Sequence, residues 1–203
     1  MTSPKLPRRT RNKLDKRARI QAAAMRLFAE RGFDATTTKA VADEAGVAAG
    51  TIFLYAQDKS DLLILAIHDE LARVIEAQFM SMPDAPLLEQ LLRVFSGFLS
   101  FYEAHPKIAG AFVQTVVTKH GPNAVEMDRL TLSALQRIAG LVQAAIDRGE
   151  LLSDVPPLLL AQNAFALYVS SLMAWLRGYA EDGRGLLRIA LELQLRGLLK
   201  TKT

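Results

Sequence analysis

The side chains that could act in catalysis are few and poorly placed for it. The chain of 203 residues has no cysteine, which excludes a thiolate nucleophile and a cysteine-ligated metal site. Carboxylate pairs such as Asp69-Glu70 fall in helical patterns, where a solvated face is the simpler interpretation. The histidines are widely separated and lack the spacing of metal ligands: His68, His105 and His120. No serine is framed as a nucleophile elbow. We therefore expect a protein that is not an enzyme, with no metal and no cofactor.

A binding role is indicated instead by residues 46–63, GVAAGTIFLYAQDKSDLL. The first ten of these residues carry no charged side chain and no Asn or Gln. Gly46 ends one short helical pattern and another begins at once, so the two helices must meet at a sharp angle, which is the helix-turn-helix arrangement. Phe53, Leu54 and Tyr55 cannot all point inward. At least one large side chain is therefore offered to a partner.

Positive charge is concentrated at the N-terminal end. Residues 1–61 hold 12 lysines and arginines against 7 acidic residues, whereas residues 62–203 hold 13 against 14. Pro4 and Pro7 discourage regular structure at the start of the chain. We expect residues 1–14 to form a flexible basic arm, which suits an anionic polymer or an anionic membrane surface; a solubilising tail is the alternative.

The hydrophobic pattern is helical throughout. Apolar residues recur at helical spacing, glycines and prolines separate the segments, and no segment shows the strict alternation of a half-buried strand. The expected fold is all-α, with three short helices in residues 15–61 and a larger bundle in residues 62–203. Helices are expected at about 15–31, 58–80, 86–104, 107–119, 122–149, 156–181 and 184–200, with two further short helices before and after Gly46. No Rossmann or P-loop glycine pattern occurs.

The N-terminal part resembles a known family. The motifs are RGFDATTT at residues 31–38, VADEAGV at 41–47, GTIFLY at 50–55 and KSDLL at 59–63. In this order and spacing they are similar to the signature of the tetracycline-repressor (TetR) family of regulators. The resemblance covers about residues 15–65, and the rest of the chain fits by length and helical content. It implies a homodimeric protein that binds double-stranded operator DNA, usually a repressor, and is released by a small-molecule effector.

In such a protein the helix after Gly46 would enter the major groove, where small and apolar side chains can touch thymine methyl groups. Phosphate contacts would fix its position. The residues that the resemblance assigns to DNA are Thr36, Thr37, Thr38, Lys39, Ala48, Ala49, Gly50, Thr51, Phe53, Leu54, Tyr55 and Lys59. Ile52 and Val47 are expected to pack against the first helix instead.

Three alanines depart from the family pattern. Ala48 and Ala49 stand where a serine and a lysine are common, so a helix cap and a phosphate contact are missing, and Ala56 replaces a common phenylalanine. A lost cap typically costs ~1 kcal/mol. We expect the basic arm to compensate, with Arg9 or Arg11 in the neighbouring minor groove.

The C-terminal bundle is expected to hold the effector and the dimer interface. Aromatic and apolar residues with few interrupting charges favour a hydrophobic effector. The candidate ligand contacts are Phe98, Tyr102, Phe112, Met127, Phe165 and Trp175. Two apolar C-terminal helices favour an interface of four helices, two from each subunit. The candidate interface residues are Leu167, Ser171, Ala174, Gly178, Leu187, Leu191, Leu195 and Leu198; packing within one subunit is the alternative.

A second function remains open. A helical carrier of small apolar ligands, whose degenerate helix-turn-helix no longer reads DNA, would also explain Ala49 and Ala56. A membrane adaptor is less favoured, because residues 13–31 use their apolar face for the N-terminal core. Apolar runs such as 62–67 are far shorter than the ~18 residues that a membrane span needs, and no signal peptide is visible. The sequence thus predicts a cytoplasmic protein without a membrane partner.

Overall fold

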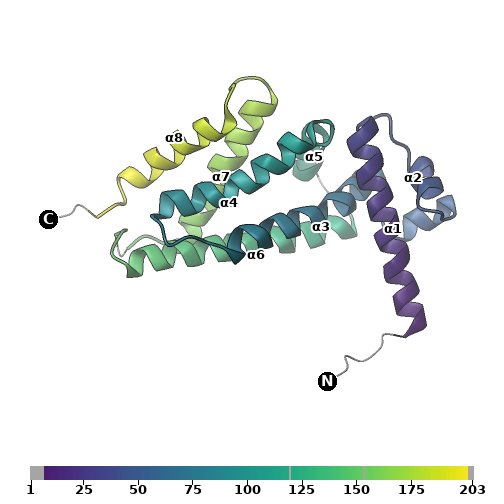
Figure 1. The fold of residues 1–203 in the computed structure, drawn as a ribbon, viewed down its shortest axis with the longest axis horizontal. Coiled ribbons are helices and arrows are strands. Elements are labelled where there is room, and N and C mark those ends of the chain that lie inside the picture. Colours follow the sequence, from purple (N-terminus) through teal and green to yellow (C-terminus); the bar gives the residue numbers. More distant parts are fainter. Residues whose placement is uncertain (1–6, 119, 153, 201–203) are drawn as a thin grey trace. The chain divides into compact units, whose positions relative to one another are not determined.

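The structure is a computed structural model, and it describes residues 7–118, 120–152 and 154–200. Within these residues the regular structure is helical, apart from an isolated β-bridge between Leu151 and Leu199. The all-α prediction is therefore confirmed. The helices run as follows (Figure 1): α1 Arg8–Arg31, α2 Thr38–Glu44, the 3-10 helix η1 Ala49–Leu54, α3 Lys59–Met80, α4 Leu87–Ala104, α5 Pro106–Thr118, α6 Pro122–Asp147, α7 Pro157–Leu176 and α8 Gly183–Arg196.

Helix α1 begins earlier than the sequence predicted. Residues 8–14, expected to be flexible, are helical, and residues 1–6 of the predicted arm lie outside the described part of the chain. The first turn forms at Pro7, whose carbonyl oxygen accepts a hydrogen bond from the Arg11 N–H at 3.0 Å. Lysine and arginine are good helix formers, so the basic sequence extends the helix once Pro7 has set its start.

Several other helix ends lie at glycine or capping residues, whereas α7 and α8 end at Leu176 and Arg196, before the expected residues 181 and 200. Gly32 and Gly46 end α1 and α2 in the left-handed region, with φ of 85° and 62°. The Thr37 side chain caps α2 by accepting a hydrogen bond from the Ala40 N–H at 3.1 Å. Asp58 accepts one from the Asp61 N–H at 2.8 Å in the first turn of α3. These side chains satisfy backbone groups that a helix end leaves unpaired.

The chain divides into two compact units. Unit 1 contains the described residues up to Glu70 together with His105–Met127, and unit 2 contains Leu71–Ala104 and the described residues from Asp128 onward. This division differs from the boundary at residues 61 and 62 expected from the sequence, because α5 and the start of α6 belong with the N-terminal helices. Helices α3 and α6 each contribute residues to both units.

The core of unit 1 forms around α1, which packs on α2 and α5. Its buried side chains include Phe28 of α1, Val41 of α2 and Ile52 of η1, all with no exposed surface. Ion pairs join the same helices at the surface, since Arg26 of α1 contacts Glu44 of α2. The hydrogen bond that the Arg26 guanidinium group donates to Glu44 raises the pKa of Arg26. Short helices of this size gain their stability from such tertiary packing.

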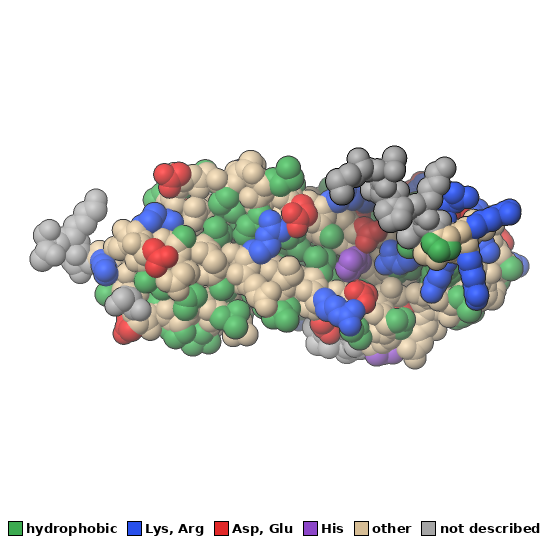
Figure 2. Space-filling model, turned by 90° about the horizontal axis from the view of Figure 1, so that it is seen from below, with side chains coloured by type: hydrophobic (Ala, Val, Ile, Leu, Met, Phe, Trp, Pro, Cys, Tyr) green, Lys and Arg blue, Asp and Glu red, His purple; other side chains and the backbone are tan. Residues whose placement is uncertain are grey.

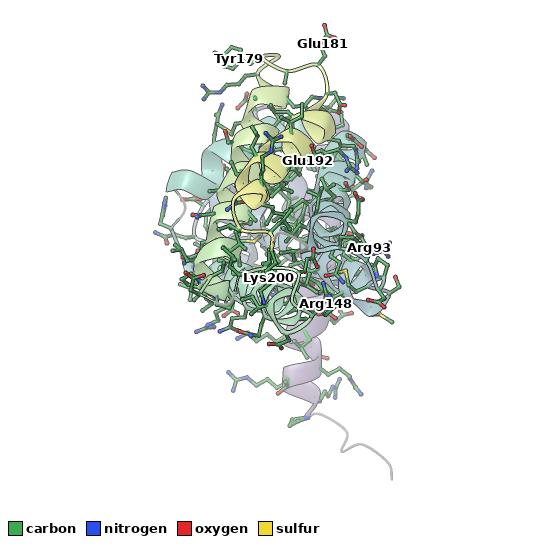
Figure 3. All side chains as sticks on the ribbon, turned by 90° about the vertical axis from the view of Figure 1, so that its left-hand side faces the viewer. Arg93, Arg148, Tyr179, Glu181, Glu192 and Lys200 are labelled. Atoms are coloured by element: carbon green, nitrogen blue, oxygen red, sulfur yellow. The ribbon has the colours of Figure 1, made fainter. Side chains whose placement is uncertain are left out.

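Unit 2 is held together by α4, α7 and α8, which pack on one another. Arg184 at the start of α8 donates to both carboxylate oxygens of Glu103 on α4, at 3.1 and 2.7 Å. Figure 3 shows Tyr179 and Glu181 in the turn that joins α7 to α8, with Glu192 on α8. Helix α7 is long and apolar enough to cross a membrane by length and composition alone. In the structure 33% of its apolar stretch is buried.

Candidate nucleic-acid interface

The 3-10 helix η1 presents two large apolar side chains to solvent. Ile52 is fully buried and Ala56 nearly so, which fixes one side of the segment against unit 1. The neighbouring Phe53 and Leu54 are 59% and 78% exposed. The core prediction for Ile52 is confirmed, whereas Val47 is only half-buried. An exposed apolar pair beside a buried anchor is the arrangement expected of a contact surface.

The start of η1 is as weakly capped as the sequence predicted. Ala48 is its N-cap residue, and no side chain there accepts a hydrogen bond. The Thr51 N–H instead donates to the Ala48 carbonyl oxygen at 2.8 Å, which closes a tight 3-10 turn. Ala48, Ala49 and Gly50 are exposed, and Thr51 is half-buried. With such small residues the backbone of η1 can approach another surface closely.

The threonines before α2 have different roles. Thr37 and Lys39 are exposed and Thr38 is half-buried, so all three can face a partner. Thr36 is fully buried, and its hydroxyl donates to the carbonyl oxygens of Gly32 at 2.8 Å and Leu27 at 3.2 Å. The prediction of a DNA contact by Thr36 is therefore wrong. The sequence pattern could not separate the buried threonine from its exposed neighbours.

We expect Thr36→Val to lower the free energy of unfolding by about 1–3 kcal/mol, because it removes the donor to a buried carbonyl group. Urea unfolding measures this change. Thr38→Val is the control and should shift the value by less than about 0.5 kcal/mol. A loss of DNA affinity in folded Thr36→Val protein, with stability unchanged, would contradict the structural role.

Tyr55 and Lys59 are already engaged within unit 1. The Tyr55 hydroxyl donates to the Lys13 carbonyl oxygen at 3.3 Å, which joins η1 to α1. The Lys59 ammonium group donates to the Phe33 carbonyl oxygen at 3.1 Å and lies 4.4 Å from the centre of the Phe33 ring. Both residues thus hold the elements that carry the exposed side chains, and their contacts with DNA stay predictions.

Basic residues of α1 form a groove with the exposed end of η1. The groove has a volume of about 770 Å³. Figure 2 shows lysine and arginine side chains gathered on this part of the molecule. The groove is lined by Arg8, Arg9, Asn12, Lys13, Lys16, Leu54 and Tyr55. The charges are evident from the sequence, but the groove is not, because it forms only when residues 8–14 are helical rather than flexible.

The predicted ligand contacts are divided between the two units. Phe112 and Met127 belong to unit 1, whereas the other four belong to unit 2. In unit 2 the rings of Phe98 and Phe165 lie 5.6 and 5.7 Å from Tyr168, which the sequence analysis missed. Tyr168 follows the apolar helical spacing of α7 and could have been found by it.

Tyr102 and Tyr168 form a hydrogen-bonded pair in this cluster. Burial raises the pKa of both phenols, because the buried site disfavours the charged phenolate. Trp175 lies seven residues after Tyr168, and its side chain packs against Gly183 at the start of α8. A Cβ atom added to Gly183 would lie 3.0 Å from Cβ of Trp175. The aromatic centre of unit 2 therefore includes Phe95, Phe98, Phe101, Phe165, Tyr102 and Tyr168, because Phe95 packs on Tyr168 and Phe101 on Tyr102, with ring centroids 5.1 and 5.3 Å apart.

Half of the predicted dimer residues are buried within a single chain. Leu187, Leu191 and Leu195 face the inside of unit 2, and Ser171 of α7 is buried as well. These four interface predictions are wrong, because the leucines at this spacing pack within their own unit. Leu167, Ala174, Gly178 and Leu198 keep accessible surface.

Another side of the same two helices is apolar and exposed. On α8 it comprises Leu186, Ile189 and Leu193, and on α7 it comprises Leu158, Leu159 and Val169. The sequence could not decide which apolar face of each helix turns inward.

Among the described residues, no group of histidine and acidic side chains has the geometry of a metal site. An exposed apolar helix beside a basic groove, on a helix-turn-helix scaffold, defines instead a protein that binds nucleic acid.

Comparison with known proteins identifies similar proteins within the class of nucleic-acid-binding proteins. The family model described as "Bacterial regulatory proteins, tetR family" matches residues 20–66. The chain is 27% identical over 187 residues to the HTH-type transcriptional repressor KstR of Rhodococcus jostii (strain RHA1), covering 89% of this chain and 83% of the relative. It is 24% identical over 166 residues to the fatty acid metabolism regulator protein of Bacillus subtilis (strain 168), covering 81% and 86%.

The fold is shared with solved regulators. The crystal structure of the transcriptional regulator FadR from Bacillus subtilis in complex with stearoyl-CoA superposes with a TM-score of 0.71 at 24% identity, covering 89% of this chain and 98% of that one. Residues 20–66 thus match the tetR family of bacterial regulatory proteins, and the chain is similar over most of its length to proteins named as transcriptional repressors.

Proposed function

We propose that the protein is a homodimeric, cytoplasmic repressor without enzymatic activity, which binds operator DNA and leaves it when a hydrophobic effector binds. The observation that carries this proposal is the exposure of Phe53 and Leu54 on η1, beside the basic groove of α1. A protein that only carried ligands would gain nothing from that pair. The family and the two relatives named as regulators support the same function.

The DNA contacts fall into two kinds. Phe53, Leu54 and the small residues at the start of η1 meet base edges in the major groove, where thymine methyl groups suit apolar side chains. Thr37, Lys39 and the basic side of α1 meet phosphates, which position the protein without reading sequence. The helical form of residues 8–14 changes the earlier expectation of an arm in the minor groove. A helix presents its lysines and arginines to the phosphates as a fixed row.

The triple substitution Arg9→Gln, Lys13→Gln and Lys16→Gln should weaken binding to operator and to unrelated DNA alike. Each lost phosphate contact should reduce the slope of log affinity against log salt by about 0.9, so three contacts reduce it by about 2.7. Titrations at several salt concentrations measure this. The triple substitution Arg129→Gln, Arg148→Gln and Arg196→Gln removes the same charge from unit 2 and is the control. An unchanged slope in the first variant would remove α1 from the interface.

The effector is proposed to be a long-chain acyl-coenzyme A. The aromatic centre of unit 2 offers apolar rings together with the hydroxyl pair of Tyr102 and Tyr168, which can orient one polar group of a ligand. The relative solved with stearoyl-CoA supports this class of ligand. A ligand can shift the protein away from DNA only if it binds the DNA-free state more tightly.

Release from DNA tests the proposed effector. We expect stearoyl-CoA to weaken the affinity for DNA flanking the gene by more than about tenfold, corresponding to a coupling free energy of about 1.4 kcal/mol. Free coenzyme A and stearate are the controls for the two halves of the ligand. If stearoyl-CoA binds and DNA affinity does not change, the effector assignment fails. Ligand binding by a protein that shows no operator preference would favour the carrier function.

Helices α3 and α6 are the proposed route of coupling, because each contributes residues to both units. In the dimer, a shift of α3 would change the separation of the two η1 helices. Operator half-sites recur at about one DNA turn, about 34–36 Å, or its multiples, so a changed separation lowers affinity at both half-sites together.

A further inference from the structure

Asn123 contacts the DNA-binding segment from a distant part of the sequence. It lies at the second position of α6, 68 residues after Tyr55, and it is buried. Its side-chain amide donates to the Tyr55 carbonyl oxygen at 2.8 Å and to the Asp61 carboxylate at 3.0 Å. One amide group therefore joins the end of η1 to the first turn of α3.

The Asp61 carboxylate is the centre of this group. It is almost fully buried and accepts hydrogen bonds from the backbone N–H groups of Gln57 at 2.9 Å and Asn123 at 3.1 Å, besides the Asn123 side chain. A buried carboxylate needs such donors to offset its lost hydration. The Asn123 N–H is one of the unpaired donors at the start of α6, so Asp61 also caps that helix.

The surrounding residues bring these groups close together. Gly121 has a φ of 97°, and a Cβ atom added to it would lie 2.8 Å from Cγ of Asp61. Only glycine fits both this backbone conformation and this distance. Next to it, His120 Nε2 lies 2.9 Å from the Asp58 carboxylate. The segment before α6 is thus fitted closely against the start of α3.

We propose that Asn123 is a positioning residue for operator binding, which holds η1 at the angle where Phe53 and Leu54 can enter the major groove. The Tyr55 carbonyl group directly follows these two exposed residues, and η1 has no side-chain cap at its other end. The Asn123 amide therefore donates a hydrogen bond to the C-terminal end of a short, weakly capped helix, which the Tyr55 hydroxyl also joins to α1. This inference rests on the proposed DNA-binding function.

Two variants that keep the net charge test the proposal in the full-length protein. Asn123→Ala removes both side-chain hydrogen bonds. The exchange Asp61→Asn with Asn123→Asp restores an amide and a carboxylate in contact, but a carboxylate at position 123 cannot donate to the Tyr55 carbonyl oxygen. Gln136→Ala truncates an exposed amide on the same helix and is the control. Thermal unfolding is measured for each variant, together with affinity for DNA flanking the gene and for an unrelated duplex.

We expect Asn123→Ala to weaken operator binding about tenfold while affinity for the unrelated duplex stays within about twofold. In the exchange variant an asparagine at position 61 has only one oxygen for the two backbone N–H groups of residues 57 and 123, so we expect at most partial recovery of the melting temperature. The operator affinity should stay as low as in Asn123→Ala, however much of the melting temperature returns. If Asn123 served stability alone, the operator affinity would instead rise and fall with the melting temperature. Operator binding within twofold of the wild type in either folded variant overturns the proposal. So does loss of folded protein in both variants, since Asn123 would then serve general stability.

Measurements on the wild-type protein distinguish failure of the proposed DNA-binding function from failure of the proposed role of Asn123. If it shows no preference for the flanking DNA over the unrelated duplex, the proposed function fails. If it shows that preference and the variants share it, only the role of Asn123 fails.

Discussion

Replacing Leu54 by glutamate should abolish operator binding while leaving the stability of the fold unchanged. Leu54 is 78% exposed, so the substitution removes little buried surface and creates no cavity. At the DNA it replaces an apolar contact with a carboxylate that faces phosphates and must lose its hydration. We expect a loss of at least about 100-fold in affinity, corresponding to about 2.7 kcal/mol.

Fluorescence anisotropy with labelled operator measures this loss, and urea unfolding confirms that the protein is intact. Met80→Glu is the matched control, because Met80 at the end of α3 is 84% exposed and receives the same charge. Its operator affinity should remain within about threefold of the wild type. Strong operator binding by the Leu54→Glu protein would show that η1 does not read DNA.

Replacing Ile189 by glutamate should dissociate the dimer and, through it, weaken operator binding. Ile189 and its neighbour Leu193 on α8 are 57% and 59% exposed in the single chain, so the fold does not need them. In a dimer interface the carboxylate would be buried without a partner, and we expect the dimer dissociation constant to rise at least about 100-fold. A monomer binds one half-site and loses the avidity of the second, typically a factor of 10²–10⁴.

Sedimentation equilibrium measures the oligomeric state directly. Leu191→Ala on the buried side of the same helix serves as the contrast, and it should lower the free energy of unfolding by about 2–5 kcal/mol through a cavity. If the Ile189→Glu protein remains a dimer, the exposed face of α8 does not form the interface.

Helix ends can be predicted from sequence where a local signal determines them. Gly32, Gly46, Thr37 and Asp58 each act through their own backbone or the next turn, so their residue types indicate the ends beside them. The segment Phe53–Tyr55 was also predicted correctly to carry exposed apolar surface, since three consecutive large residues on a short helix cannot all be buried.

The errors have a common physical origin in tertiary packing. The burial of Thr36 depends on the carbonyl groups of Gly32 and Leu27 that happen to lie above it. The inward orientation of Leu187 depends on which apolar side of α8 the other helices of unit 2 cover. The hydrophobic periodicity of the sequence is the same whether these side chains are buried or exposed, so periodicity alone could not predict their burial.

Asn123 could not have been found from the sequence for the same reason. It stands at the start of a helix, where an asparagine is ordinary, and its partners Tyr55 and Asp61 are more than sixty residues away. Asp61 lies in the first turn of its own helix, and in the structure it also caps α6. Long-range contacts of this kind add no local pattern to the chain.

Binding of the purified protein to DNA flanking its own gene, with an excess of unrelated duplex present, tests the central claim most directly. The account predicts saturable binding that survives the competitor, carried by the exposed side chains of η1 and strengthened by the basic side of α1. Binding that the competitor abolishes would show only the electrostatic attraction of α1 for phosphates, and it would contradict the assignment of this surface as a reader of operator DNA.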